Sequence, residues 1–123
     1  MLLSNEERLK QIADNSSIII SLKDLDGKYI HVNPAFEKFF GTTLKAVRGR
    51  TAAECFSEEV GQQVNIKDDE VRSKEAIIEK EVGFSVNGKL IFHQLFSFPF
   101  YNESGRVAGI FTFAHELTSI REN

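Results

Sequence analysis

Residues 24–41 read DLDGKYIHVNPAFEKFFG, and this stretch predicts a turn, a short strand and a very short helix in immediate succession. Asp26 and Gly27 form one of the strongest short signals for a tight hairpin turn. Residues 17–24 (SIIISLKD) and 28–32 (KYIHV) are therefore expected to be the two antiparallel strands that this turn connects.

The end of the same stretch carries the start and stop signals of a short helix. Asn33 is a good N-cap residue, and Pro34 suits the first helical position, where its missing N–H group costs nothing. Gly41 is placed to end the helix in a left-handed conformation. One apolar face is formed by three residues with i, i+3 and i+4 spacing: Phe36, Phe39 and Phe40.

Composition places the chain among ordinary globular domains. Its 123 residues are most simply one domain, with 41% hydrophobic and 27% charged residues. A net charge of −3 argues against a basic surface for nucleic acid or for an anionic membrane. The single cysteine, Cys55, cannot form an internal disulfide, and no apolar run approaches the roughly 18 residues of a membrane span. We expect a cytoplasmic domain without nucleic-acid or direct membrane contact.

Helical signals flank the opening stretch. Residues 1–15 are expected to carry a flanking helix, with Leu9 and Ile12 on a narrow apolar face. Short helical turns should begin at Thr43 and at Thr51, the second in a capping-box arrangement with Glu54. A longer helix over 57–75, capped by Ser57, has only a thin apolar stripe that includes Val60 and Val64.

The second half of the chain is rich in strand signals. Residues 76–86 and 89–100 are expected to form a hairpin around Asn87 and Gly88, and 107–117 a fifth strand. Five strands with helices between the second and the third indicate an α+β domain around an antiparallel sheet. We assign 16–118 to this domain and the polar residues 119–123 to the start of a linker.

Several motifs occur together in the order of a known family. They are D-x-x-G-x-x-x-x-x-N-P-A-F from Asp24 to Phe36, F-G at Phe40–Gly41, G-R at Gly49–Arg50, P-F-x-x-x-x-G-x-V-x-G from Pro99 to Gly109, and E-L-T at Glu116–Thr118. In this order the chain resembles a PAS domain from about Leu9 to Thr118. The resemblance implies a five-stranded antiparallel sheet, short helices packed across one face around a small cavity, and an N-terminal flanking helix.

The strand at 89–100 leaves open which of its two faces is buried. Hydrophobicity alone would bury the phenylalanine set, whereas the resemblance turns Ile91, His93, Leu95 and Ser97 toward the cavity. The ligand-pocket candidates that it implies are Phe36, Phe40, Val60, Val64, His93, Leu95, Ser97, Ile110, Thr112 and Ala114. The opposite face would then carry Phe92, Phe96, Phe98, Phe111 and Phe113. That apolar patch is expected to be covered by Leu9, Ile12 and a second protomer in a homodimer.

The sequence offers little support for catalysis, for a metal or for a known cofactor. No nucleophile elbow, phosphate-binding glycine loop or zinc motif occurs, and the three histidines lack metal-ligand spacing. In residues 49–56 (GRTAAECF), Cys55 does not occupy the position of the reactive cysteine in flavin photosensors of the family. Residues 57–75 contain no histidine, although many haem-binding members have one on the corresponding helix. The cofactor is therefore unknown, with flavin photochemistry and haem disfavoured. The alternative is a small α+β enzyme or binding protein with His93 and Glu81 as an acid–base pair.

The resemblance implies a regulatory rather than an enzymatic role. Such a domain senses a small ligand, or dimerises and relays a conformational signal, inside a bacterial-type signalling protein. The expected output domain is a histidine kinase of a two-component system or a diguanylate cyclase (GGDEF) domain. The signal would leave through Glu116, Leu117 and Thr118 into a segment beyond Asn123. The simpler alternative is a domain whose interior is filled by its own side chains and which serves only as a relay.

Overall fold

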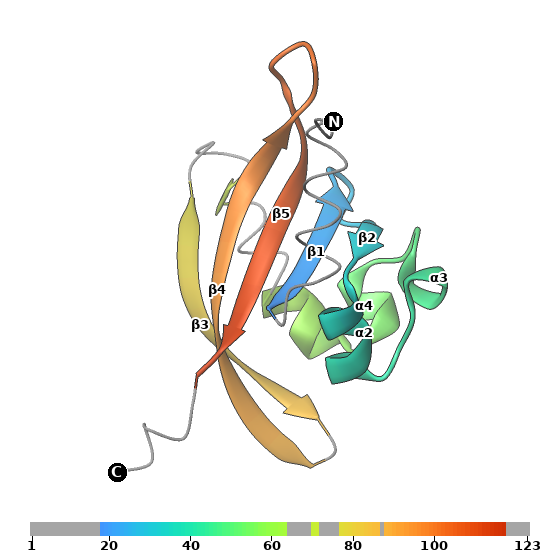
Figure 1. The fold of residues 1–123 in the computed structure, drawn as a ribbon, viewed down its shortest axis with the longest axis vertical. Helices are drawn as coiled ribbons and strands as arrows, with labels where there is room; N and C mark the ends of the chain where they lie inside the picture. Colours follow the sequence, from blue (N-terminus) through green and yellow to red (C-terminus); the bar gives the residue numbers. More distant parts are fainter. Residues whose placement is uncertain (1–17, 64–69, 72–76, 87, 118–123) are drawn as a thin grey trace, which may run out of the picture.

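The computed structural model describes residues 18–63, 70–71, 77–86 and 88–117 (Figure 1). The flanking helix predicted within 1–15, with Leu9 and Ile12, and the linker at 119–123 lie outside the described residues. So do Val64 and Thr118.

A five-stranded antiparallel sheet forms the body of the domain, as predicted. The spatial order of the strands is β2-β1-β5-β4-β3, so the last strand lies in the centre and pairs with the first. The strands are β1 (Ile19–Asp24), β2 (Tyr29–Val32), β3 (Ile78–Val86), β4 (Lys89–Tyr101) and β5 (Val107–Glu116).

The first hairpin turn has the predicted chemistry. Asp24 accepts two backbone hydrogen bonds on its Oδ1 atom, from the N–H groups of Asp26 and Lys28. Gly27 has a φ of 79°, a conformation that glycine adopts without steric cost. The second hairpin pairs Val86 with Lys89, so β3 and β4 are joined as closely as the sequence indicated.

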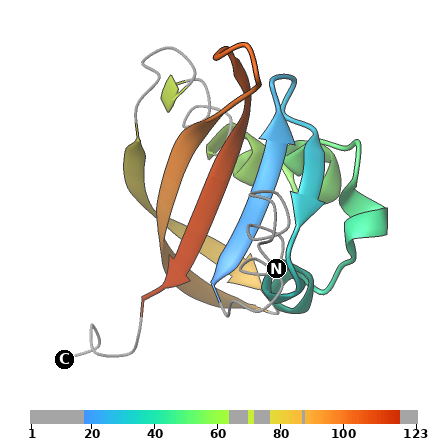
Figure 2. The same cartoon turned by 45° about the horizontal axis from the view of Figure 1, so that its top comes forward.

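The helices gather on one side of the sheet, beside β1 and β2 (Figures 1 and 2). They are α2 (Pro34–Phe40), α3 (Leu44–Val47) and α4 (Ala52–Cys55), and residues 58–63 and 70–71 are also helical. The four predicted caps are confirmed. Asn33 caps α2, Thr43 accepts from the Ala46 N–H, and Thr51 and Glu54 form a capping box. Ser57 Oγ accepts from the Val60 N–H at 3.1 Å.

Asn33 does more than cap α2. Its Oδ1 atom accepts hydrogen bonds from the N–H groups of Phe36 and Ile20, both at 3.0 Å. Its Nδ2 atom donates to the backbone oxygen of Ile18 at 2.7 Å. The side chain is fully buried, so one amide holds the start of the helix against the first strand. This contact fixes where the phenylalanines of α2 lie over the sheet.

The two faces of β4 have opposite characters. His93, Leu95 and Ser97 are buried and face the helices, whereas Phe92 on the other face is 44% exposed. The register pairs Phe96 with Phe113 and Phe98 with Phe111. The outer face therefore carries a ladder of phenylalanine rings, with Phe98 and Phe111 stacked at a centroid distance of 5.6 Å.

Candidate functional site

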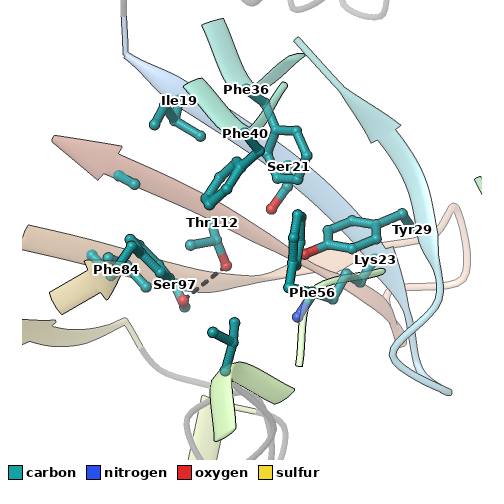
Figure 3. A pocket seen from close by; sticks show the side chains of 13 residues that line it. Ile19, Ser21, Lys23, Tyr29, Phe36, Phe40, Phe56, Phe84, Ser97 and Thr112 are labelled. Carbon is teal, nitrogen blue, oxygen red and sulfur yellow. Dashed lines mark hydrogen bonds between the residues drawn. The ribbon is translucent and has the colours of Figure 1, made fainter. Parts of the chain in front are cut away.

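A small cavity lies between the inner face of the sheet and the phenylalanines of α2 (Figure 3). All five strands contribute to its wall, together with α2 and the helical segment after α4. The lining residues are Ile19, Ser21, Lys23, Tyr29, Phe36, Phe40, Phe56, Val60, Phe84, Leu95, Ser97, Thr112 and Ala114.

The cavity is small. Its volume of about 40 Å³ is roughly a quarter of that of the ~150 Å³ cavity known to hold benzene. It still exceeds the ~10–15 Å³ that one water molecule needs, so the space suits a very small molecule or group.

Three hydroxyl groups lie in a row across the floor of the cavity. Ser21 on β1 pairs with Thr112 on β5, which in turn pairs with Ser97 on β4. Ser97 Oγ and Thr112 Oγ1 are 2.9 Å apart and share a hydrogen bond, drawn as a dashed line in Figure 3. Ser21 and Ser97 are both buried. The central strands thus present aligned polar groups inside a mostly apolar wall.

Lys23 is one of six lining residues that sequence reasoning missed; the others are Ile19, Ser21, Tyr29, Phe56 and Phe84. Lys23 follows Ser21 on the same face of β1, lines the cavity, and is only 2% exposed. Its Nζ atom lies 5.3 Å from the centroid of the Tyr29 ring, a distance at which a cation is attracted to the π-face. Of the cavity-lining residues in the described part of the chain, Lys23 alone carries a formal charge.

A second hollow lies outside the first and shares part of its wall. Its volume is about 450 Å³, and it borders α4, residues 57–63 and the β3–β4 hairpin. Phe40, Phe56 and Val60 line both spaces. The rings of Phe40 and Phe56 are 4.7 Å apart, so these three side chains form a partition between the inner cavity and the outer groove.

The outer groove also contains the one cysteine of the chain. Burial raises the pKa of the Cys55 thiol, against smaller opposing effects of the Arg50 and Lys23 charges. A raised thiol pKa lowers the thiolate fraction at neutral pH and makes nucleophilic chemistry at Cys55 less favourable. Within the described segments, no cluster of three or more histidine, cysteine or carboxylate side chains could hold a metal ion.

Most of the predicted pocket residues lie around the cavity, but two do not. The residues that line it as expected are Phe36, Phe40, Val60, Leu95, Ser97, Thr112 and Ala114. The placement of His93 beside Ser97 and Thr112 is wrong. His93 lies farther along β4, where Phe39 and Phe84 cover its ring at centroid distances of 4.8 and 5.5 Å. Ile110 is buried but lies outside the cavity wall.

The proposed pairing of His93 with Glu81 is also wrong. Val82, not Glu81, lies opposite His93 in the β3–β4 register. Because successive side chains point to opposite faces of a strand, Glu81 lies on the other face of the sheet, where it is exposed. The two groups cannot exchange a proton across one pocket, so the acid–base alternative loses its site.

His93 should make the stability of the domain depend on pH. Burial lowers the pKa of His93, opposed by the backbone oxygen of Ile91, 3.4 Å away, and by the nearby Glu116. His115 lowers it further. The unfolded chain, with a histidine pKa of about 6.5, then binds more protons than the folded one. Stability is therefore full above that pH and should fall as the pH drops below it.

The test compares urea unfolding of the wild type and His93→Phe between neutral and mildly acidic pH. Phenylalanine keeps the ring contacts and removes Nε2, which has no hydrogen-bond partner among the described residues. We expect a flatter pH profile in this variant and only a small change in the control His115→Gln, because the exposed His115 makes the smallest of the contributions to the shift in the His93 pKa. An unchanged profile in His93→Phe would contradict the assignment.

The described helices include none with the length and apolar character needed to cross a membrane.

Comparisons with known proteins agree with this architecture. The chain is 29% identical over 122 residues to a methanogenesis regulatory histidine kinase, FilI, of Methanothrix harundinacea (strain 6Ac), a match that covers 98% of this chain and 14% of the relative. Among solved structures, it is similar to the PAS domain of Bordetella pertussis BvgS, with a TM-score of 0.82, 19% identity, and coverage of 95% of this chain and 89% of the other.

A second solved structure, Vibrio cholerae VqmA, superposes with a TM-score of 0.84 at 18% identity, covering 97% of this chain and 53% of that one. At these identities both superpositions speak to the fold alone. The sequence profile of the PAS fold matches residues 13–122. The chain therefore belongs to the PAS fold family.

Proposed function

We propose that this domain is a sensory module in which a small ligand occupies the cavity and alters the state of an output domain elsewhere in the protein. One observation carries the proposal: a row of buried hydroxyls and a buried ammonium line an otherwise apolar cavity. A mostly apolar pocket with a few convergent polar groups is the usual form of a small-ligand site.

The output domain that we propose is a histidine kinase. The chain spans about 14% of the length of the histidine kinase that it matches, so the catalytic part of such a protein would lie in other segments. This similarity favours a kinase in a two-component pathway over a diguanylate cyclase. We place the domain in the cytoplasm and, because of its net charge of −3, without a nucleic-acid partner of its own.

β5 is the element that we propose to carry the signal. It contributes Thr112 and Ala114 to the cavity wall and ends at Glu116. The next residue, Leu117, donates its N–H to the Phe92 oxygen at 2.9 Å, which ties the exit of the chain to β4. A ligand that contacts Thr112 differently in two states would shift the end of the strand. In the full-length protein, Glu116→Gln should alter regulation; normal regulation would contradict the relay.

The outer face of the sheet is the surface that we propose for a homodimer. Phe96, Phe98, Phe111 and Phe113 are only half-buried, and Phe92 is more exposed. Contiguous apolar patches of this kind are rare on monomers. Light scattering at high micromolar concentration should give the mass of a dimer, and a strict monomer would count against this surface.

The sensory role predicts that a small molecule accompanies the protein and depends on the cavity. Val60→Phe adds volume to the partition and should fill the cavity from the helical side. The control is Glu58→Phe, which introduces the same residue two positions away on the exposed surface. Small molecules released from each purified protein by heat are then compared by mass spectrometry.

We expect at least one compound to be enriched in the wild type and in Glu58→Phe and to be depleted at least about tenfold in Val60→Phe, a change of ~1.4 kcal/mol in binding. Circular dichroism establishes that both variants are folded. If no compound differs between two folded variants, the ligand-sensing proposal fails and the domain is a relay with a self-filled core.

A further inference from the structure

We infer that His93 is a proton-operated switch: binding of one proton to its ring loosens the exit end of the sheet, formed by Phe92, His93, Glu116 and Leu117. The inference goes beyond ligand sensing, because His93 lies outside the cavity wall and its response needs no bound molecule. It gives the domain a second input, the acidity of its surroundings, at the place where the chain leaves β5.

The His93 ring is buried and one of its nitrogens lacks a partner. The side chain is 1% exposed. Its Nδ1 atom lies 3.4 Å from the backbone oxygen of Ile91, a contact that favours the hydrogen of the neutral ring on Nδ1 and leaves Nε2 as an acceptor. Nε2 is buried and has no hydrogen-bond partner among the described residues. Buried polar atoms without partners are uncommon in native proteins, and this one is free to bind a proton.

The surroundings of the ring do not suit a charge. Phe39 of α2 and Phe84 of β3 pack edge-on against His93 at centroid distances of 4.8 and 5.5 Å. Neither ring has an oxygen or nitrogen acceptor. A proton on Nε2 therefore creates a charged N–H group without an acceptor in its present position, and burial of such a group is unfavourable. Burial accordingly lowers the pKa of His93.

An acceptor for this proton lies at the exit end of the sheet. Glu116 on β5 is directly opposite His93 in the β4–β5 register, so both side chains lie on the same face. Glu116 is exposed, and its charge favours the protonated form of the His93 ring. A shift of the ring toward Glu116 would give the new N–H group a charged acceptor at a position that water can reach.

The other charged groups around His93 do not compete for this role. The charged or titratable side chains on the described elements packed around the ring are Glu116 and His115 on β5, Lys80, Glu79 and Glu81 on β3, Lys89 on β4, and Glu37 and Lys38 on α2. The three lysines are exposed and cannot accept a proton's hydrogen bond. The β3 glutamates and His115 lie on the other face of the sheet, and the Glu37 carboxylate already accepts the Leu44 N–H at 2.7 Å.

A shift of the His93 ring would disturb two contacts at the exit end. Phe39 packs on the ring, so the last turn of α2 would lose that support. The Leu117 N–H donates at 2.9 Å to the oxygen of Phe92, the residue next to His93. The closed state holds a neutral buried ring, and the open state holds a charged ring in water beside Glu116. Protons bind these two states unequally, which is what a switch requires.

The test measures hydrogen exchange of the Leu117 N–H by NMR, with each rate divided by its intrinsic rate at the same pH. An exposed histidine has a pKa of about 6.5. As the pH falls below that value, we expect the protection of this N–H to drop by up to about tenfold per pH unit until His93 is protonated in the closed state as well. The protection of the Gly105 N–H, which donates to Asn102 in the distant β4–β5 turn, should stay constant. Circular dichroism establishes that the domain remains folded.

Two variants assign the effect to His93. His93→Phe keeps an aromatic ring between Phe39 and Phe84 but cannot bind a proton, and we expect the protection of Leu117 to become independent of pH. The control is His115→Gln, which removes the exposed histidine on the other face and should keep the pH-dependent loss. The wild-type measurement needs no variant, so the test stands even if a substitution at this buried site is not tolerated.

Three results would overturn the inference. They are a constant protection of Leu117 in the wild type, an unchanged pH dependence in a folded His93→Phe, and a loss of protection that occurs only together with global unfolding. The last result would leave His93 as a determinant of stability alone. None of them bears on ligand sensing, which is decided separately by whether a compound is depleted in Val60→Phe.

Discussion

Replacing Asn33 by alanine should cost roughly 3–5 kcal/mol of folding stability, one of the largest effects of any single polar substitution in this domain. The side chain is fully buried and makes three hydrogen bonds, to the N–H groups of Phe36 and Ile20 and to the oxygen of Ile18. Its loss removes the cap of α2 and takes one hydrogen-bond partner each from the Ile20 N–H and from the Ile18 oxygen, which lies just before β1. Urea unfolding followed by circular dichroism measures the change.

The matched control is Thr43→Ala, the same kind of N-cap deletion at an exposed position. Thr43 accepts one hydrogen bond from the Ala46 N–H at 3.1 Å, and water can replace it. This substitution should cost about 1 kcal/mol. If Asn33→Ala costs no more than Thr43→Ala, the side chain does not hold α2 against the sheet as the structure indicates.

Phe36→Ala should lower stability by about 3–5 kcal/mol, the range expected when a buried aromatic ring is removed. Phe36 is 3% exposed, and its ring lies 4.7 Å from that of Phe40, 5.4 Å from that of Tyr29 and 6.0 Å from that of Phe56. Because it also lines the cavity, its removal should merge the vacated space with the existing one. Thermal unfolding reports the loss.

An enlarged apolar cavity should bind benzene, since dry engineered cavities of ~150 Å³ do so. We therefore expect benzene to raise the melting temperature of Phe36→Ala much more than that of the wild type. The control is Phe39→Ala on the same helix, because Phe39 packs against His93 and does not line the cavity. Equal stabilisation of both variants by benzene would contradict the position assigned to Phe36.

The short elements could be predicted because local chemistry determines them. The first turn is specified by the side-chain acceptor of Asp24 and the positive φ of Gly27. Asn33-Pro34 specifies a helix start through an acceptor and a fixed φ. Each signal depends on residues close in sequence. The resemblance to the PAS family then placed these elements in a sheet order that local signals do not contain.

The polar half of the site could not be predicted, because it depends on register between distant strands. Ser21 and Lys23 become cavity residues only because β1 pairs with β5, about ninety positions later in the chain, so that Ser21 lies beside Thr112. The sequence around Lys23 reads as the end of a strand near a turn, where a lysine is usually exposed. His93 was misplaced for a related reason: its face was predicted, but its position along β4 relative to α2 was not.

The faces of β4 show where hydrophobicity alone misleads. The phenylalanine set is the more apolar one, yet the buried face carries Ser97 and pairs Leu95 with Ala114. The bulky rings of α2 occupy the space above the sheet, so small side chains face them and leave a cavity. The larger rings of β4 and β5 then point to the outer face, where they form the surface proposed for a dimer.

A crystal structure of the protein as purified tests the central claim most directly. We expect electron density for a bound small molecule in the cavity, beneath the rings of Phe36 and Phe40 and in contact with at least one hydroxyl of Ser21, Ser97 or Thr112. A cavity filled by its own side chains, with no such density, would contradict the account.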